Sequence, residues 1–158
     1  MAGRASARGR NVSKNPTYPA AAIPYLMIRG AADALDFYKK AFGAGETMRF
    51  PIPDGKIGHA EIQIEGAPVF LADESPESGM RSPQQLGGTT VTVSVYVKDV
   101  DAFAKRAEAA GATVIRPVAD QFYGERNVGF QDPFGHIWYF STVKETLTVE
   151  EVMKRMPK

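Results

Sequence analysis

The stretch DALDFYKKAFGA, residues 33–44, has the apolar spacing of a short amphipathic helix that ends at a Gly-Ala stop. A related stretch, DVDAFAKRAEAAGA, occupies residues 99–112. Phe37 recurs 66 residues later as Phe103, and each is followed, after one residue, by two basic residues and an alanine. A strand-like run precedes each helix and two or three more follow it, so a β-α-β-β-β unit occurs twice. We therefore expect an α+β fold in which two similar, curved mixed sheets surround one cleft.

The composition bounds the classes of protein to consider. At 158 residues and 44% apolar, the chain can form one domain, or two small modules that share a core. A net charge of +1 gives no overall field that would attract nucleic acid. The lack of cysteine excludes disulfides, thiolate nucleophiles and cysteine-ligated metals. The absence of cysteine also fits a reducing cytoplasm, where we expect the protein to be located. No apolar run approaches the roughly 20 residues that span a bilayer, so we expect no membrane partner.

The N-terminal segment differs from the rest of the chain. Residues 1–20 contain arginine, lysine and small residues but no acid, which is typical of a disordered basic tail or a leader. A transit peptide is the alternative for such an Arg- and Ser-containing, acid-free start.

The remaining sequence divides into a main domain, residues 21–146, and a C-terminal segment. Within the domain, a stretch rich in Ser, Pro, Gly and Gln separates the two repeats. A Thr-Val-Glu-Glu capping box predicts a terminal helix. The predicted boundaries are a first module at about 21–74, a linker at 75–88, a second module at about 89–143, and a C-terminal helix within 147–158.

Two predicted strands alternate clearly between polar and apolar side chains. Within residues 57–64, His59, Glu61 and Gln63 share a polar face, with His59 and Glu61 about 7 Å apart along the strand, and Ala60, Ile62 and Ile64 share the apolar face. In residues 89–97, valines alternate with Thr, Ser and Tyr. The repeats supply helices for only one face of each sheet. The polar faces are therefore either wet surfaces or the walls of a shared binding cleft.

Six short motifs carry a family resemblance through their order and spacing. They are PYL (24–26), DFYKKAFGA (36–44), DGKIGHAE (54–61), DVD (99–101), YGER (123–126) and DPFGHIW (132–138). With these motifs the chain, from residue 23 to about 155, resembles the vicinal oxygen chelate superfamily, which includes glyoxalase I, extradiol dioxygenases, fosfomycin-resistance enzymes and bleomycin-binding proteins. It is most similar to the PhnB-like, glyoxalase/bleomycin-resistance-like branch. The resemblance implies paired βαβββ modules and commonly a homodimer.

The resemblance also implies where a metal would be held. Metal-dependent members bind a divalent ion through His, Gln or Glu side chains on the first and last strands of each module, and the ion acts as a Lewis acid. In this sequence those places fall near Ile23 or Tyr25, and at Phe70, Thr92 and Tyr139. None of these is a good ligand for a divalent metal. We therefore expect no cofactor; the alternative is a divalent metal held by a different set of ligands.

The candidate site residues are mostly aromatic or apolar, with a few polar groups. Such a lining suits flat or amphipathic organic molecules. The resemblance, through the Tyr-Gly-x-Arg motif, implies that Arg126 lies near the cleft, where it would bind an anionic group or pair with Glu61 or Glu125. His136 is expected to be structural. The predicted ligand-binding residues are Tyr25, Met27, Phe50, His59, Glu61, Phe70, Thr92, Tyr123, Arg126, Phe130 and Tyr139.

Three functions remain open from the sequence. The first is sequestration of an aromatic or amphipathic natural product or antibiotic, as in bleomycin-binding relatives, with no metal and no bond made or broken. The second is a glyoxalase-like lyase or isomerase, or a dioxygenase-like enzyme, in which His59 and Glu61 are catalytic, with or without a divalent metal. The third is an interaction domain whose cleft has lost its ligand. The expected partners are a small organic ligand and a second copy of the chain, with no nucleic acid.

Overall fold

The computed structural model describes residues 18–158, so the predicted tail at 1–20 lies mostly outside the described residues. The first module comprises β1 (Tyr25–Ile28), α1 (Ala31–Phe42), β2 (Gly45–Pro51), the 3-10 turn η1 (Pro53–Gly55), β3 (Ile57–Ile64) and β4 (Ala67–Asp73). The second comprises β5 (Thr92–Tyr96), α3 (Val100–Ala109), β6 (Thr113–Asp120), β7 (Glu125–Gln131) and β8 (Ile137–Val143). The connection contains η2 (Pro76–Ser78) and α2 (Pro83–Leu86), and α4 (Val149–Arg155) follows the second module.

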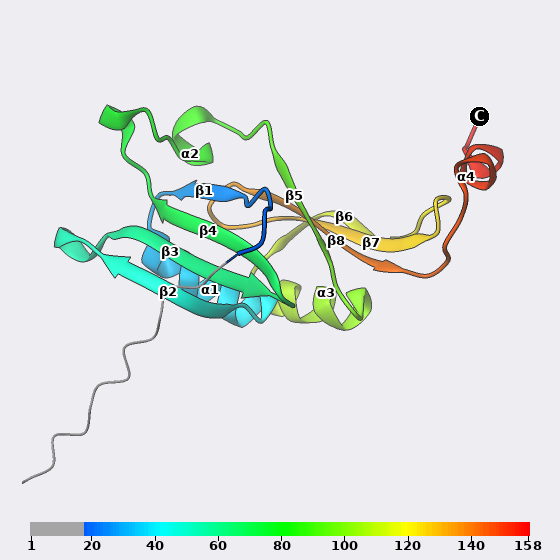
Figure 1. Ribbon diagram of the computed structural model, residues 1–158, viewed down its shortest axis with the longest axis horizontal. Helices are drawn as coiled ribbons and strands as arrows, with labels where there is room; N and C mark the ends of the chain where they lie inside the picture. The colour runs from blue at the N-terminus through cyan, green and yellow to red at the C-terminus, as the bar shows by residue number, and fades with distance from the viewer. Residues whose placement is uncertain (1–17) are drawn as a thin grey trace, which may run out of the picture.

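The two modules have the same topology, which confirms the predicted α+β fold of two mixed sheets. The strand orders are β1-β4-β3-β2 and β5-β8-β7-β6. In each sheet the first strand is at an edge and pairs in parallel with the last, and the other pairs are antiparallel. The two sheets lie next to each other, with α1 and α3 on the same side (Figure 1).

The linker contains more structure than its composition predicts. The hydroxyl of Ser82 accepts a hydrogen bond from the backbone N–H of Gln85 at 3.3 Å, and Pro83 occupies the first helical position. A Ser N-cap followed by proline is a strong helix start, so the short helix α2 forms where Ser, Pro, Gly and Gln indicated only a loop.

The last strand of each module caps the helix of the same module. In the first, the Asp73 carboxylate accepts hydrogen bonds from the N–H groups of Gly30 and Ala31, at 3.0 and 3.1 Å. In the second, the Thr142 hydroxyl accepts one from the N–H of Val100 at 2.9 Å. These bonds satisfy backbone donors that a helix start leaves unpaired, and they fix each helix against its sheet.

The two modules share one hydrophobic core between their helices. Phe42 at the end of α1 stacks on Phe103 of α3, with ring centroids 5.6 Å apart. It also meets Trp138 and Phe140 of β8 edge-on or tilted, at 5.1 and 4.8 Å. All four side chains are at most 2% exposed. Dense aromatic packing of this kind stabilises the pairing of the modules beyond simple area burial.

A buried carboxylate ties the modules together. Asp132, in the turn between β7 and β8, is 4% exposed. Its Oδ2 accepts hydrogen bonds from the Tyr38 hydroxyl of α1 at 2.6 Å and the Trp138 indole N–H at 2.9 Å. Its Oδ1 accepts from the N–H groups of Phe134 and His136, both at 2.9 Å. Burial and the neighbouring Asp132 charge raise the pKa of Tyr38 well above its ordinary value, so its hydroxyl remains a donor.

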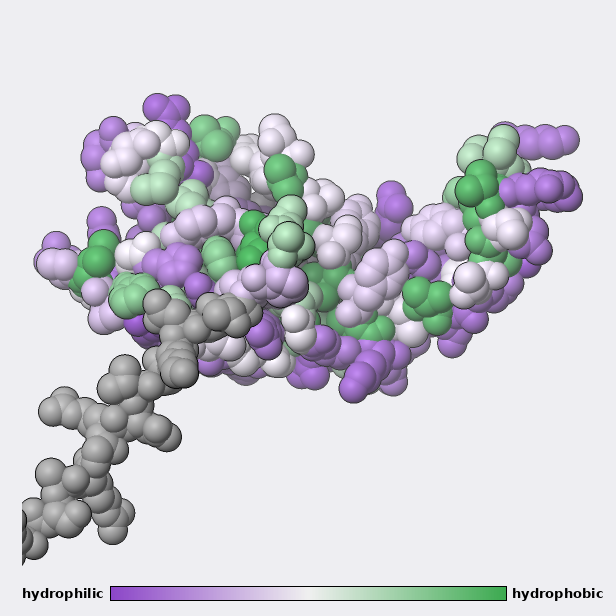
Figure 2. All heavy atoms as spheres, in the orientation of Figure 1, coloured by the Kyte–Doolittle hydropathy of each residue, from purple (hydrophilic) through white to green (hydrophobic). Residues whose placement is uncertain are grey.

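The C-terminal helix stands apart from the rest of the molecule (Figure 1). Thr148 and Glu151 form the predicted capping box, and no residue of α4 is buried. Val149 and Met153 are 77% and 66% exposed, and hydrophobic atoms appear over this helix in Figure 2. Within residues 18–158, no helix has the length and apolar character needed to cross a membrane.

We predict that Tyr38→Phe lowers the free energy of unfolding by about 1.5–3 kcal/mol, because it removes one hydrogen bond to a buried charged group. Tyr96→Phe is the matched control. It removes a hydrogen bond of similar length, 2.7 Å to Glu125, from a side chain that is 61% exposed. We expect a change within about 0.5 kcal/mol there. Urea denaturation measures both, and equal losses in the two variants would contradict the role given to Asp132.

Candidate functional site

The strand register defines which side chains share the face of the first sheet that is turned away from α1, called here the open face. Tyr25 pairs with Phe70, and Glu61 pairs with Phe70 from the other side. Directly paired residues lie on the same face of a sheet. The neighbouring pair, Ala60 and Leu71, is fully buried on the helix side.

Four polar side chains form a continuous hydrogen-bonded chain on the open face, called here the His59 network. The Tyr25 hydroxyl lies 2.8 Å from His59 Nδ1, and His59 Nε2 lies 3.1 Å from Glu61 Oε1. The Tyr18 hydroxyl donates to Glu61 Oε2 at 2.6 Å. Because an ionised carboxylate only accepts, Nε2 carries the proton in this pair. In the neutral imidazole, Nδ1 then accepts from Tyr25.

Aromatic rings cover this polar chain. The His59 ring lies 5.1 Å from Phe70, 5.3 Å from Tyr25 and 6.3 Å from Phe50, measured between centroids. Tyr18 meets Phe70 edge-on at 5.5 Å. The Glu61 side chain is only 8% exposed beneath them, whereas Tyr25 and Phe50 are 46% and 53% exposed. The open face therefore presents accessible rings above a largely buried carboxylate.

Both tyrosines keep their protons at neutral pH. Burial raises the pKa of Tyr18, and its hydrogen bond to Glu61 adds to the effect. Burial alone raises the pKa of Tyr25. The two hydroxyls therefore act as hydrogen-bond donors, one to the imidazole and one to the carboxylate. A ligand over this face would meet aromatic rings, two phenols and an imidazole edge.

The second sheet has its own polar open face, with a cavity of about 140 Å³. Tyr123 and Tyr139 line it, together with Asn127, whose amide donates to the Tyr123 hydroxyl at 2.7 Å. A Cβ at Gly129 would lie 2.9 Å from a ring carbon of Tyr139, so the glycine leaves room for that ring. Thr92 lies on β5 of the same sheet, and its side chain is exposed.

The predicted site residues therefore separate into groups. Tyr25, His59, Glu61 and Phe70 come together, with Phe50 beside them. Tyr123, Tyr139 and Thr92 belong to the second sheet. Met27 lines a larger cavity of about 690 Å³ between β1 and the segment leading into β5. His136, expected to be structural, is 7% exposed, and its Nε2 donates to the Met27 carbonyl at 3.1 Å.

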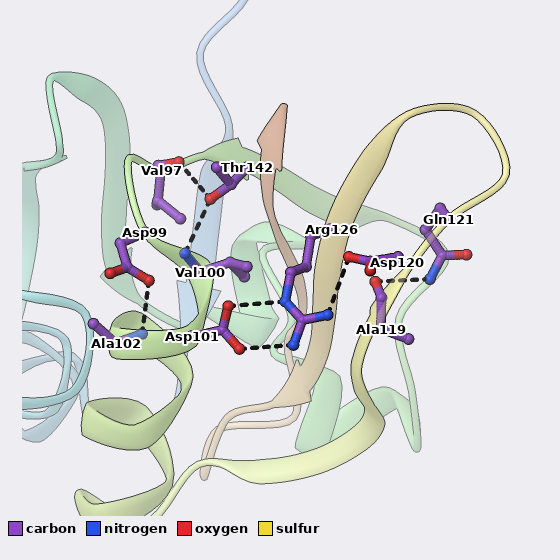
Figure 3. Close-up of polar contacts among 10 residues, drawn as sticks. All are labelled: Val97, Asp99, Val100, Asp101, Ala102, Ala119, Asp120, Gln121, Arg126 and Thr142. Atoms are coloured by element: carbon purple, nitrogen blue, oxygen red, sulfur yellow. Dashed lines mark hydrogen bonds and ion pairs between the residues drawn. The ribbon is translucent and has the colours of Figure 1, made fainter. Parts of the chain in front are cut away.

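Arg126 does not lie in the cleft, which corrects its predicted role. It pairs with Thr142 on the helix side of β7. Its Nε and Nη2 each donate to the Asp101 carboxylate of α3 at 2.8 Å, and its Nη1 donates to Asp120 at 3.0 Å (Figure 3). The guanidinium lowers the pKa of the Asp101 carboxyl. These are the acids that pair with Arg126, in place of the expected Glu61 or Glu125.

Phe130 was also expected to face the cleft and is instead a core residue. It pairs with Trp138 and is fully buried. Asn127 and Gly129 occupy the open face of β7, so Arg126, Val128 and Phe130 necessarily point the other way.

Two polar residues of these faces, Tyr18 and Asn127, were not predicted from the sequence. Tyr18 lies within the segment assigned to the tail, although it is the first aromatic residue of the chain and stands close to the first strand. Asn127 is one of three consecutive polar residues in β7, and nothing in that run marks it as the one on the open face.

The side chains at the family's metal positions do not fit a divalent ion. Tyr25 and Phe70 meet on the first sheet, 5.9 Å apart between centroids, and Thr92 and Tyr139 lie on the second. A protonated phenol, a phenyl ring and a threonine hydroxyl are poor ligands for such metals. Among residues 18–158, no three His, Asp or Glu side chains gather closely enough to hold a metal ion.

Comparison with known proteins gives relatives with high coverage. The uncharacterized protein Mb0911c of Mycobacterium bovis is 44% identical over 136 residues, which cover 84% of this chain and 90% of that protein. The uncharacterized protein At5g48480 of Arabidopsis thaliana is 31% identical over 129 residues, 75% of each chain.

Solved structures agree on the fold. TioX from Micromonospora sp. ML1 has a TM-score of 0.64 at 28% identity and covers 82% of this chain and 100% of its own. The fosfomycin resistance protein FosX from Listeria monocytogenes, complexed with Mn(II), has a TM-score of 0.59 at 18% identity, with 88% and 98% covered. The model of the Glyoxalase/Bleomycin resistance protein/Dioxygenase superfamily matches residues 22–140. The chain belongs to this superfamily.

Proposed function

We propose that the protein binds a small aromatic or amphipathic organic molecule on the open face of its first sheet, over the His59 network, without a metal. The observation that carries the proposal is the cluster of accessible rings around a partly exposed His59 and a buried Glu61. Tyr25 and Phe50 are about half exposed there. Covering an aromatic side chain removes apolar surface from water and is worth about 1.5–3 kcal/mol when the side chain becomes fully buried.

The His59 network gives such a ligand an orientation. Glu61 and Tyr18 hold each other at 2.6 Å, and Glu61 in turn fixes the tautomer of His59. Tyr25 is held by His59 at 2.8 Å, so its oxygen keeps lone pairs for a ligand donor. A pre-arranged polar group among rings is the usual composition of a small-molecule site.

The relatives support a binding role in general terms only. FosX is by its name a resistance protein for the antibiotic fosfomycin, and its similarity to this chain, at 18% identity, is one of fold. An antibiotic or other natural product as the ligand here, in the manner of bleomycin resistance, is therefore part of the proposal.

We predict that Phe70→Ala weakens the binding of any aromatic ligand by about tenfold, because Phe70 contacts three of the rings in the cluster. The measurement is a thermal-shift screen with aromatic antibiotics, bleomycin among them, followed by calorimetric titration of each hit. Phe122→Ala removes another partly buried phenyl, far along the chain in the β6–β7 turn, and should leave affinity unchanged. If no aromatic compound binds the wild type, the proposal fails.

A second candidate function follows from the geometry of the same network. His59 Nδ1 lies within proton-transfer reach of the Tyr25 hydroxyl, and Glu61 is placed to stabilise the imidazolium that would form. A lyase or isomerase of the glyoxalase type could use this pair as general base and partner. The side chains at the positions where the family would hold a metal are poor ligands, so we assign no step of this reaction to a metal ion.

For this alternative, we expect His59→Ala to lower turnover of a hemithioacetal substrate by at least about a hundredfold, because general-base catalysis contributes that much. Tyr25→Phe, which keeps the ring and loses the hydroxyl, should lower it less. A stopped assay with methylglyoxal and glutathione measures both. Unchanged turnover in His59→Ala would exclude a reaction in which His59 is the general base. It would not affect the proposal that the open face binds a ligand.

The homodimer and the cytoplasmic location remain proposals. The half-exposed rings of the open face favour a second copy as one way of closing the cleft, since apolar surface of this kind is costly when left in water.

A further inference from the structure

One cavity in the described residues shares Tyr25 with the His59 network but none of the network's other members. It has a volume of about 690 Å³ and lies between β1, the α2 segment and the approach to β5. This volume is typical of sites for small organic ligands. Its apolar walls come from these three segments and include Met27, Pro83, Leu86 and Val91. Tyr25 lines the cavity, and its hydroxyl is hydrogen-bonded to His59 of the network.

The charged lining of the cavity is positive. No aspartate or glutamate lines it, and Arg81 is its one charged lining residue. Within residues 18–158, Arg81 forms no ion pair or side-chain hydrogen bond, whereas Arg29 close by pairs with Glu74 at 2.6 Å. A guanidinium without an acidic partner beside an apolar wall is suited to a carboxylate or another anionic group.

A buried polar group supplies a second, independent feature. His136 lines the cavity and is 7% exposed. Its Nε2 must carry a proton, because it donates to the Met27 carbonyl. Burial lowers the pKa of His136 and outweighs the opposing effect of Asp132, so the ring is neutral at pH 7. Nδ1 is then an acceptor, and it has no hydrogen-bond partner in the part of the chain that the structure describes.

We propose that this cavity is a second binding site, which takes an elongated and mostly apolar organic anion. The anionic group pairs with Arg81, the apolar body lies along Met27, Pro83 and Val91, and a hydroxyl or N–H donor of the ligand reaches His136. Leu86 and Val91 at the mouth are 61% and 62% exposed. Figure 2 shows hydrophobic residues on the α2 segment and on the strand leading into β5, where such a ligand would cover them.

The test uses decanoate as the probe and decan-1-ol as its neutral counterpart, titrated calorimetrically into the full chain. We expect decanoate to bind about tenfold more tightly than the alcohol, and Arg81→Gln to abolish that difference. Lys105→Gln, which removes an exposed positive charge from α3, is the matched control and should preserve it. Leu86→Glu, at an exposed position, should weaken decanoate by placing a negative charge at the mouth.

Methionine methyl NMR locates the ligand. Decanoate should shift the Met27 signal and leave that of Met153 on α4 in place. His59→Ala should bind decanoate as the wild type does, so this result is independent of the function proposed for the open face. The inference is overturned if decanoate does not bind, if decan-1-ol binds the wild type as tightly as decanoate, if Arg81→Gln keeps the wild-type preference for decanoate, or if the Met27 signal does not respond.

Discussion

The arrangement of the molecule depends on one buried carboxylate. Asp132 accepts four hydrogen bonds, two from backbone N–H groups of its own turn and two from Tyr38 and Trp138. A buried carboxylate without hydrogen-bond donors would be strongly destabilising, so Asp132 can be buried here only when these donors are in place. Because Tyr38 lies on α1 of the first module and Asp132 in a turn of the second, the hydrogen bond from Tyr38 forms only when the two modules are docked. The same turn delivers His136 to the carbonyl of Met27, which brings β1 close to the second module.

Docking through the helix side determines what is left for function. With α1 and α3 in one layer, the helix-facing residues of both sheets become core and their alternates form the open faces. On the first sheet, the aromatic residues of β1, β2 and β4 cover the His59–Glu61 pair of β3. The edge strands β1 and β5 contribute to the lining of one cavity, and the linker helix α2 adds apolar side chains to it. Both proposed sites thus result from the packing of the two sheets against one layer of helices.

Much of this could be predicted from the sequence. The repeat indicated the topology, and the alternation of residues 59–64 placed His59 and Glu61 on one face. The phase of β7 could not be obtained in this way, because Glu125, Arg126 and Asn127 are all polar and alternation has no starting point there. Alternation therefore could not correct the motif that placed Arg126 in the cleft, and both Arg126 and Phe130 were predicted on the wrong face. The Asp73 cap and the Tyr18 contact are long-range, and only the folded chain brings these residues to their partners.

We propose that this superfamily fold here binds an organic molecule through rings and phenols in place of a metal. The most direct test is the metal content of the protein by elemental analysis, as purified and after incubation with nickel, cobalt, zinc, manganese and ferrous iron. We expect far less than one equivalent under every condition, because the positions that the resemblance implies for the metal ligands hold Ile23 or Tyr25, Phe70, Thr92 and Tyr139. Near-stoichiometric metal, lost on substitution of His59 or Glu61, would contradict the claim.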